Sequence, residues 1–423
     1  MTIREKRKRR HRRLFSFFGG LALAATPLIA GTASRAAGAD FIHAEGTRLV
    51  DANGDIFAVK GINLGNWLLP EGYMFKFARA RAPTEIEAVI EALIGREQAS
   101  RFWARFHDVY VAQADIHFIE AAGFNTVRVP LNWRLFVEAG EATDADRFEG
   151  PGWALLDRLV GWCRQAGLRV IIDLHAAPGG QTGVNHDNGS GYPLTFYVPR
   201  ERRLTIALWR ALASHYRNDP TILGYDLLNE PISPYSDEDY LNPRLEPLYR
   251  EIVAVIRSVD PNHLVLLEGG QWSTSFAVFG RPFDANSVYT YHKFWAKPNR
   301  AALQTYLNFS KRWNVPLLIG ETGEFNDDWN ARFRRLHERL GIGWVFWPYK
   351  SLDSETAVVS IREPAGWHLV TAAGSVDAAT LKPDSLPPRG QVLAILNAYL
   401  EAAEFSNVRV NGGYLKSLGL AEP

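Results

Sequence analysis

The sequence predicts an α/β fold, a (β/α)8 TIM barrel, from two apolar runs that end in carboxylates and from the strand and helix patterns that alternate around them. The first run, residues 222–230, ends in Asn229 and Glu230. Pro231 cannot donate a hydrogen bond to a sheet, so we expect this strand to end at Glu230. The second run ends in Glu321. Since the carboxyl ends of all barrel strands meet at one face, we expect these side chains to share one site.

The composition is that of an ordinary globular protein. The chain has 423 residues, of which 47% are hydrophobic and 22% are charged, which suffices for one large barrel or two smaller domains. The one cysteine, Cys163, lies in a helical pattern and is expected to be a buried apolar residue, so an internal disulfide is excluded. Because neither a repeat nor a low-complexity linker divides the chain, we assign residues 40–405 to the barrel and residues 406–423 to a C-terminal tail.

The first 39 residues have the pattern of an export signal. A strongly basic segment precedes the mostly apolar residues 14–30, and Ala37-Gly38-Ala39 resembles a cleavage site. The Arg12-Arg13 pair fits a twin-arginine leader, and an ordinary secretory signal is the alternative. The apolar segment is too short and too interrupted to indicate a membrane span. The sequence therefore predicts an exported protein, periplasmic or extracellular.

Removal of this leader changes the net charge. Residues 1–39 carry nine Lys or Arg and one Glu, so the charge of +1 for the whole chain becomes about −7 without them. An acidic protein of this kind is a poor partner for nucleic acid or for an anionic membrane. We expect a monomer that binds only its substrate.

A hairpin and a helical insertion are expected on either side of the first barrel strand. Residues 41–56 contain short alternating runs around Asn53-Gly54, a strong hairpin signal, and this hairpin is expected to plug the bottom of the barrel. Residues 57–63 are predicted to form the first strand, and residues 71–112 a long, helix-rich insertion. A helix over residues 115–122 then ends at a glycine, as helices commonly do.

From residue 126 onward, strand and helix patterns alternate. The further predicted strands are 126–130, 169–175, 222–230, 264–268, 287–292, 315–321 and 343–347. The helices predicted between and after them are 153–166, 201–216, 245–258, 301–313, 328–340 and 391–403. Together with the first strand, this gives the eight strands of a closed barrel.

Polar or aromatic side chains end nearly every predicted strand. They are Asn63, Arg128, His175, Asn229, Glu230, Glu268, His292, Glu321 and Trp347. A doubly wound sheet would place its ligand groups at one switch point instead, so the pattern favours the mouth of a barrel. Two carboxylates in different environments on facing strands are what hydrolysis of a glycosidic bond requires.

Five segments, in this order, make the chain resemble glycoside hydrolase family 5, the cellulase-type barrels that retain anomeric configuration. They are Phe124–Pro130, Asp173–Gln181, Asp226–Pro231, Gly320-Glu321 and Trp344–Trp347. The resemblance covers most of residues 41–403. It implies an enzyme without cofactor or metal that cleaves a β-linked, glucan-like polysaccharide or oligosaccharide.

The resemblance also implies a role for each residue at the strand ends. Glu230 would be the acid/base and Glu321 the nucleophile, with carboxyl groups about 5–5.5 Å apart, as covalent retention requires. Arg128 would lie near Glu321 and lower its pKa. Asn229 would bind the 2-hydroxyl of the sugar, a contact that strengthens in the transition state.

Three more residues are carried over with one departure from the family pattern. His175 and His292 would form hydrogen bonds around the reacting sugar, and Trp347 would be the platform beneath it. The family usually has a Tyr two residues after the sixth-strand His, where this chain has Phe294. Either Tyr291 or another donor takes over its bond to the nucleophile, or the nucleophile lacks that bond.

Several alternatives stay open. The segment from Asp173 is similar to exo-acting β-1,3-glucanases of the family as well as to endoglucanases, so the first hypothesis is an endo-acting β-glucanase and the second an exo-acting glucan 1,3-β-glucosidase. A metal-dependent barrel hydrolase is disfavoured because no strand carries closely spaced histidines. A catalytically inactive glycan-binding barrel is disfavoured by the intact pair of acids. Glu268 and Glu324 compete with Glu321 for the role of nucleophile.

Overall fold

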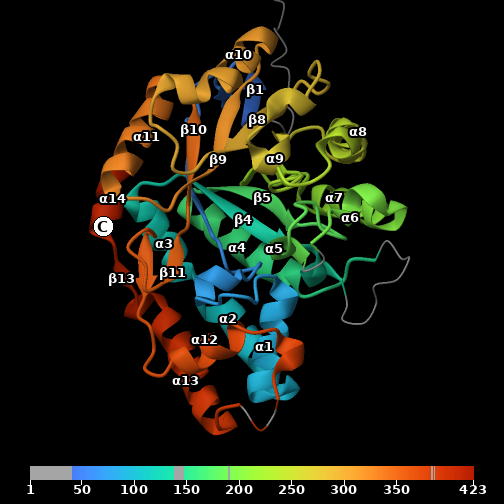
Figure 1. Cartoon of the computed structure of the whole chain (residues 1–423). Helices are drawn as coiled ribbons and strands as arrows, with labels where there is room; N and C mark the ends of the chain where they lie inside the picture. Colours follow the sequence, from blue (N-terminus) through green and yellow to red (C-terminus); the bar gives the residue numbers. More distant parts are fainter. Residues whose placement is uncertain (1–40, 138–146, 189–190, 383, 385) are drawn as a thin grey trace, which may run out of the picture. The chain divides into compact units, whose positions relative to one another are not determined.

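A closed barrel of eight parallel strands forms the centre of the molecule (Figure 1). The structure is a computed structural model that describes residues 41–137, 147–188, 191–382, 384 and 386–423. The predicted leader, residues 1–39, lies outside the described residues. The strands pair in the order β10-β3-β4-β5-β6-β7-β8-β9. Their bounds are β3 (Lys60–Asn63), β4 (Thr126–Asn132), β5 (Arg169–Ala176), β6 (Ile222–Asp226), β7 (Leu264–Glu268), β8 (Ser287–His292), β9 (Leu317–Gly323) and β10 (Gly343–Trp347).

Helices follow the strands and cover the outside of the barrel, which confirms the predicted (β/α)8 fold. The long helices are α3 (Gln113–Ala122), α4 (Gly152–Ala166), α7 (Pro199–Tyr216), α8 (Glu238–Arg257), α10 (Gln304–Trp313), α11 (Asp327–Arg339) and α13 (Arg389–Ala403). Short helices in the loops are α5 (Asn185–Asn188), α6 (Leu194–Tyr197), α9 (Gly270–Ser273) and α12 (His368–Gly374). Among the described residues, no helix is both long and apolar enough to span a membrane.

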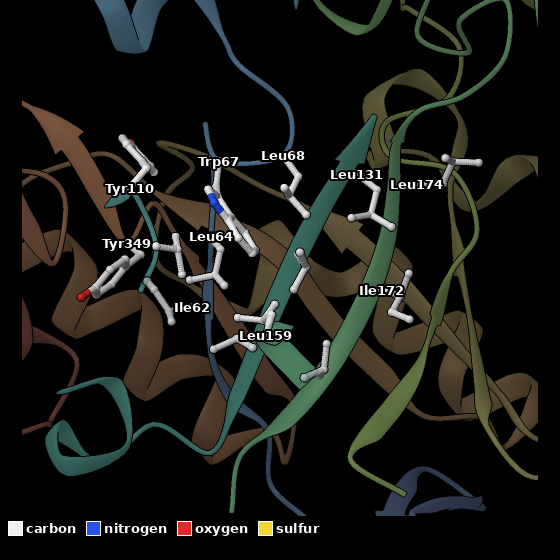
Figure 2. Packing of buried hydrophobic residues seen from close by; sticks show 14 of the residues in the cluster. Ile62, Leu64, Trp67, Leu68, Tyr110, Leu131, Leu159, Ile172, Leu174 and Tyr349 are labelled. Atoms are coloured by element: carbon white, nitrogen blue, oxygen red, sulfur yellow. The ribbon is translucent and has the colours of Figure 1, made fainter. Parts of the chain in front are cut away.

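Alternation along the strands separates two hydrophobic layers from a polar interior. Leu131 of β4 and Ile172 of β5 belong to the large cluster between the strands and the helices, together with Leu159 of α4 (Figure 2). Residues at the alternate positions of these strands, among them Arg128 of β4 and Asp173 of β5, point the other way, into the barrel. The interior near the carboxyl ends of the strands therefore carries polar side chains, and the interior near their amino ends is apolar.

The hairpin closes the bottom of the barrel, as predicted. Strands β1 (His43–Glu45) and β2 (Arg48–Val50) pair antiparallel. Ile42 and Leu49 from this hairpin lie in one buried cluster with inward-pointing strand residues such as Leu223 and Val345. This apolar plug leaves the carboxyl ends of the strands as the open face.

The insertion after β3 is helical, also as predicted, and packs beside the barrel mouth. It contains η1 (Gly72–Phe75), α1 (Pro83–Ile94) and α2 (Arg96–Val109). Phe75 is buried against the rings of Phe106 and Tyr399, which fixes η1 to α2 and to α13. The loop between η1 and α1 is thereby held at the rim of the barrel.

Two predicted boundaries and the predicted tail are corrected. The strand expected to end at Glu230 ends four residues earlier, at Asp226, because the main chain of Leu227 and Asn229 bonds to neighbouring strands while leaving the regular ladder. The strand expected from residue 57 begins at Lys60. Residues 406–423 do not form a separate tail.

The last residues belong to the domain. Strand β13 (Arg409–Val410) pairs with β12 (Val359–Ile361), which pairs with β11 (Lys350–Leu352), and α14 (Gly412–Ser417) packs on α11. The Tyr414 hydroxyl donates a 3.1 Å hydrogen bond to the main-chain oxygen of Trp347. The C-terminal segment therefore supports the end of β10 directly.

Candidate active site

Arg128 lies at the centre of the polar interior and is completely buried. Its guanidinium lies within 2.5–3.1 Å of side-chain oxygens of Asn63, Asp173, Asp226, Asn229, Glu268 and Glu321. Burial opposes the charged form, but these carboxylates outweigh burial and raise the pKa of Arg128 well above its usual range. A permanent cation thus holds together six side chains, which come from five other strands and from the segment after β6.

The structure brings Glu230 and Glu321 together at the open face. One carboxylate oxygen of each lies within 4.8 Å of the other and of a His292 nitrogen. Two oxygens this close are compatible with the separation of about 5–5.5 Å between carboxyl groups that covalent retention needs, and they favour it over the about 6.5–9.5 Å that inversion needs. Glu230 adopts a left-handed backbone conformation, with φ of 47°, and its N–H donates a 2.7 Å bond to Glu268.

The pKa of Glu321 shifts in the direction opposite to the one expected from Arg128 alone. Burial raises it, and the charges of His292 and Arg128 oppose the rise without cancelling it. Arg128 Nη1 lies 2.5 Å from Oε1 of Glu321, so the predicted contact is present. The expectation of a net lowering was wrong because it left out desolvation.

His292 is a second cation of the site. Its Nδ1 lies 3.0 Å from Glu230 and 3.8 Å from Glu321, and its Nε2 lies 3.2 Å from Glu268. Burial acts against its charge, yet these carboxylates raise the pKa of His292 well above its usual range. The surrounding carboxylates therefore favour the charged imidazolium form of this ring, which lies beside both acids.

Glu268 supports the site, although the sequence suggested it only as a competitor of Glu321. Burial alone would raise its pKa, but His292 and Arg128 lower the pKa of Glu268 to about 2. Its position after the apolar run 264–267 was the same signal that singled out Glu321. Asp226 was missed as a partner of Arg128, and the signal available for it was a charged residue inside an apolar run.

His175 is neutral and has its orientation fixed on two sides. Its Nδ1 donates to Asp173 at 2.7 Å, and its Nε2 lies 3.1 Å from Asn229 Nδ2. Burial lowers the pKa of His175 to about 4. The ring stacks on Trp347 with centroids 5.8 Å apart and an interplanar angle of 17°. The predicted residues His175, Asn229 and Trp347 thus form one contiguous surface beside the two acids.

Tyr291 does not replace the tyrosine that the family usually has. Its hydroxyl donates a 2.9 Å bond to His337 Nε2, on the helix side of β8 and away from Glu321. Phe294 lines the pocket and has no polar group to offer. The donors that lie closest to Glu321 are instead Arg128 and His292.

The Tyr291–His337 contact gives a testable pH dependence. Burial lowers the pKa of His337 to about 4, whereas an unfolded chain protonates histidine near 6.5. The unfolded state therefore gains a proton first, and stability is lost as pH falls from 6.5 to 4. Relative to His337→Gln, the wild type should lose up to about 3 kcal/mol of unfolding free energy over this range, measured by denaturant titration at several pH values. Parallel profiles of the two proteins would contradict this assignment.

The acids open into a pocket of about 400 Å³. Its lining includes Trp347 and His175 and, from the insertion, Glu71, Tyr73 and Phe77. This volume falls within the range of small-molecule sites, about 300–1,000 Å³. The pocket offers an aromatic face and several carboxyl groups to one ligand.

Among the described residues, three clusters of side chains could in principle share a metal ion, but the carboxylates in them already pair with Arg128 or His292. The clusters are Asp173/His175/Glu321, Glu230/His292/Glu321 and Asp173/Asp226/Glu268. Each contains carboxylates bound to Arg128 or to His292, so an added divalent cation would meet like charge at a few ångströms. These charges support a metal-free site, which remains a prediction.

Comparison with known proteins identifies the family. Residues 89–353, more than half of the chain, match the family described as Cellulase (glycosyl hydrolase family 5). The chain belongs to glycosyl hydrolase family 5. This family-5 enzyme is therefore a glycoside hydrolase, in agreement with the five segments singled out in the sequence.

Relatives of the family-5 enzyme act on different sugars according to their names. A β-xylosidase of Phanerodontia chrysosporium is 30% identical over 363 residues, which cover 76% of this chain and 73% of the relative. A probable glucan 1,3-β-glucosidase A of Neosartorya fischeri is 30% identical over 220 residues, which cover 51% of each chain. The enzyme thus spans about half the length of the glucan 1,3-β-glucosidases that it matches.

Solved structures agree in fold. A rutinosidase of Aspergillus niger matches with a TM-score of 0.56 and 18% identity, covering 71% of this chain and 92% of that one. An endogalactoceramidase matches with a TM-score of 0.58 and 17% identity, covering 90% and 86%. At these identities the likeness concerns the barrel alone.

Proposed function

We propose that this family-5 enzyme is an exported, retaining β-glycosidase that cleaves a β-glucan-like substrate by double displacement. Glu321 is the nucleophile and Glu230 the acid/base. The observation that carries this proposal is the close approach of the two carboxylates, within 4.8 Å, at the open face of one barrel.

In the first step, an oxygen of Glu321 attacks the anomeric carbon while Glu230 gives its proton to the leaving oxygen. The bond from the anomeric carbon to that oxygen breaks, and a covalent glycosyl ester forms on Glu321. The side chain of Glu230 is 21% exposed and that of Glu321 is 7% exposed, so the acid/base is the one that meets the leaving group at the mouth.

In the second step, Glu230 takes a proton from water as the water attacks the anomeric carbon. The ester bond breaks and Glu321 leaves as a carboxylate, restoring the enzyme. Arg128 and His292 touch Glu321 and favour this anion electrostatically. The two cations thus assist the departure of the nucleophile in the second step.

The sugar is positioned by the surface next to the acids. Trp347 presents its ring to the pocket and suits the apolar face of a sugar ring. The side-chain oxygen of Asn229 accepts from Arg128, and its Nδ2 lies beside His175, so the amide is fixed in one orientation. This amide is the group we assign to the 2-hydroxyl.

Segment 71–81 of the insertion contributes to the pocket lining, and we call it the wall. This wall favours exo-cleavage over the endo-cleavage that the sequence placed first. Lys76 forms ion pairs with Asp353 and Glu363, at 3.1 and 2.9 Å. The main-chain N–H groups of Arg79 and Ala80 donate to the oxygen of Gly374. Residues on both sides of these anchor points line the pocket, among them Tyr73 and Arg81. We expect the wall, anchored in this way, to block one end of the pocket, which suits a chain end better than a through-running polysaccharide. The glucan 1,3-β-glucosidase names among the relatives agree with this choice.

A product profile tests the proposal. On laminarin we expect glucose as the main early product, with little activity on carboxymethylcellulose, because only a chain end enters a closed pocket. Early release of oligosaccharides would favour the endoglucanase instead. Loss of activity with a chelator would favour a metal-dependent hydrolase, and binding without turnover a glycan-binding barrel.

A further inference from the structure

Glu324 is a further acid of the pocket beside Glu71, Glu230 and Glu321, and it is placed by an unusual loop after β9. It follows Glu321 by three residues and has a φ of 49°, in the left-handed region. Gly323 precedes it with a φ of 129°, and a Cβ at Gly323 would come within 2.6 Å of the Trp347 main-chain oxygen. Left-handed non-glycine residues cost of order 1 kcal/mol and gather at functional sites. This backbone path brings the Glu324 side chain into the pocket lining.

Among the described residues, one of the two carboxyl oxygens of Glu324 takes part in a hydrogen bond. Its Oε1 accepts a 3.1 Å bond from the Tyr73 hydroxyl, and that hydroxyl accepts a 2.6 Å bond from Trp347 Nε1. Its main-chain oxygen accepts from Trp295 Nε1. Within the described ranges, Oε2 has no hydrogen-bond partner. A pocket acid held in place through one oxygen leaves the other oxygen for a ligand.

The protonation of Glu324 suits a neutral ligand. Burial raises its pKa to about 7, with the charge of Glu321 adding to the rise and the bond from Tyr73 opposing it. Below that pH the group is largely a neutral carboxylic acid that can donate as well as accept. Such a group binds a hydroxyl without adding a third full negative charge beside Glu321.

The position of Glu324 indicates which part of the sugar it meets. The anomeric carbon must lie between Glu321 and Glu230, and the leaving group departs on the Glu230 side. Glu324 follows Glu321 in the chain by three residues, and its side chain bonds to Tyr73 of the insertion and not to Glu230. With the anomeric carbon seated between Glu321 and Glu230, the remote edge of the ring is left to the other residues that line the pocket, among them Tyr73 and Glu324.

We propose that Glu324 is a specificity-determining residue that binds a hydroxyl on this remote edge of the glycone, at carbon 4 or carbon 6. The inference rests on the proposed function, because it takes the glycone to be seated between Glu321 and the wall. It makes the enzyme selective for a neutral hexose that carries this hydroxyl. A site built to bond a hydroxyl discriminates strongly against the analogue that lacks it.

The test compares Glu324→Ala with the wild type on 4-nitrophenyl β-glucoside and on its 4-deoxy and 6-deoxy analogues. A hydrogen bond to an ionisable group contributes enough that kcat/KM on the parent should fall about 10- to 100-fold, mainly through KM. In the wild type, one deoxy analogue should show a similar loss. On that analogue, the substitution should cause little further loss, because the contact is already missing.

A purely supporting role gives a different result. If Glu324 serves only to hold Tyr73, then Glu324→Ala and Tyr73→Phe should both lower kcat/KM equally on all three substrates, and this would overturn the inference while the proposed function stands. Glu324→Gln keeps the volume and one acceptor and should lose less than Glu324→Ala. Glu401→Ala, an exposed acid on α13, is the matched control and should behave as the wild type. A wild type that hydrolyses no β-glycoside would refute the proposed function and this inference with it.

Discussion

Replacement of Glu321 by glutamine should lower kcat/KM on aryl β-glucosides by about 10⁴-fold or more. Glutamine has nearly the same volume, so the pocket is kept, but it cannot form the glycosyl ester. Arg128 and His292 would retain their other carboxylate partners, which limits any effect on folding. Steady-state hydrolysis, with circular dichroism to confirm folding, measures this effect.

Two further variants separate the roles of the acids. Glu321→Ala leaves room for azide, which should restore turnover and yield a glycosyl azide of inverted configuration. Glu230→Gln should lose about 10²–10⁴-fold on substrates whose leaving group needs a proton. It should still release a dinitrophenolate quickly in the first step, because that group leaves without protonation. If Glu321→Gln retains most of the activity, then Glu268 or Glu324 is the nucleophile instead.

Arg128→Met should lower the free energy of unfolding by about 3–5 kcal/mol. Methionine fills a similar volume but leaves Asp173, Asp226, Glu268 and Glu321 buried without their shared cation. An unpaired buried charge is far more costly than the ion pair it came from. Urea denaturation at neutral pH measures the change.

Arg134→Met is the matched control for this prediction. Arg134 pairs with Glu87 at 3.0 Å, and both side chains are about 40% exposed. Exposed pairs contribute about 0–1 kcal/mol, so this variant should unfold close to the wild type. Equal effects of the two substitutions would show that the buried acids of the barrel take up protons instead of requiring Arg128.

The barrel and the paired acids were predictable from sequence because both follow from local patterns. An apolar run followed by a polar residue locates a strand end, and closure of the barrel brings all such ends to one face. Arg128, His292 and Glu321 were placed in this way. Glu230 was placed although its strand ends four residues earlier, because it still follows the same run.

The parts of the site that the sequence did not predict depend on contacts between segments that are distant in the chain. The pairing of Glu268 with both Arg128 and His292 requires knowing which strands face each other across the barrel. Tyr73 lies in the short helix η1 and Glu324 in the loop after β9, 251 residues apart in the chain, and neither segment has a periodic signal. The upward shift of the pKa of Glu321 follows from desolvation, which a sequence does not display.

The Tyr414 hydroxyl binds the main-chain oxygen of Trp347, the residue that we propose as the sugar platform. Proteolytic removal of the last dozen residues should therefore disturb the pocket without removing any residue that lines it. We expect activity to fall when these residues are lost. Mass spectrometry should then show loss of C-terminal residues in step with falling turnover, while the barrel remains folded.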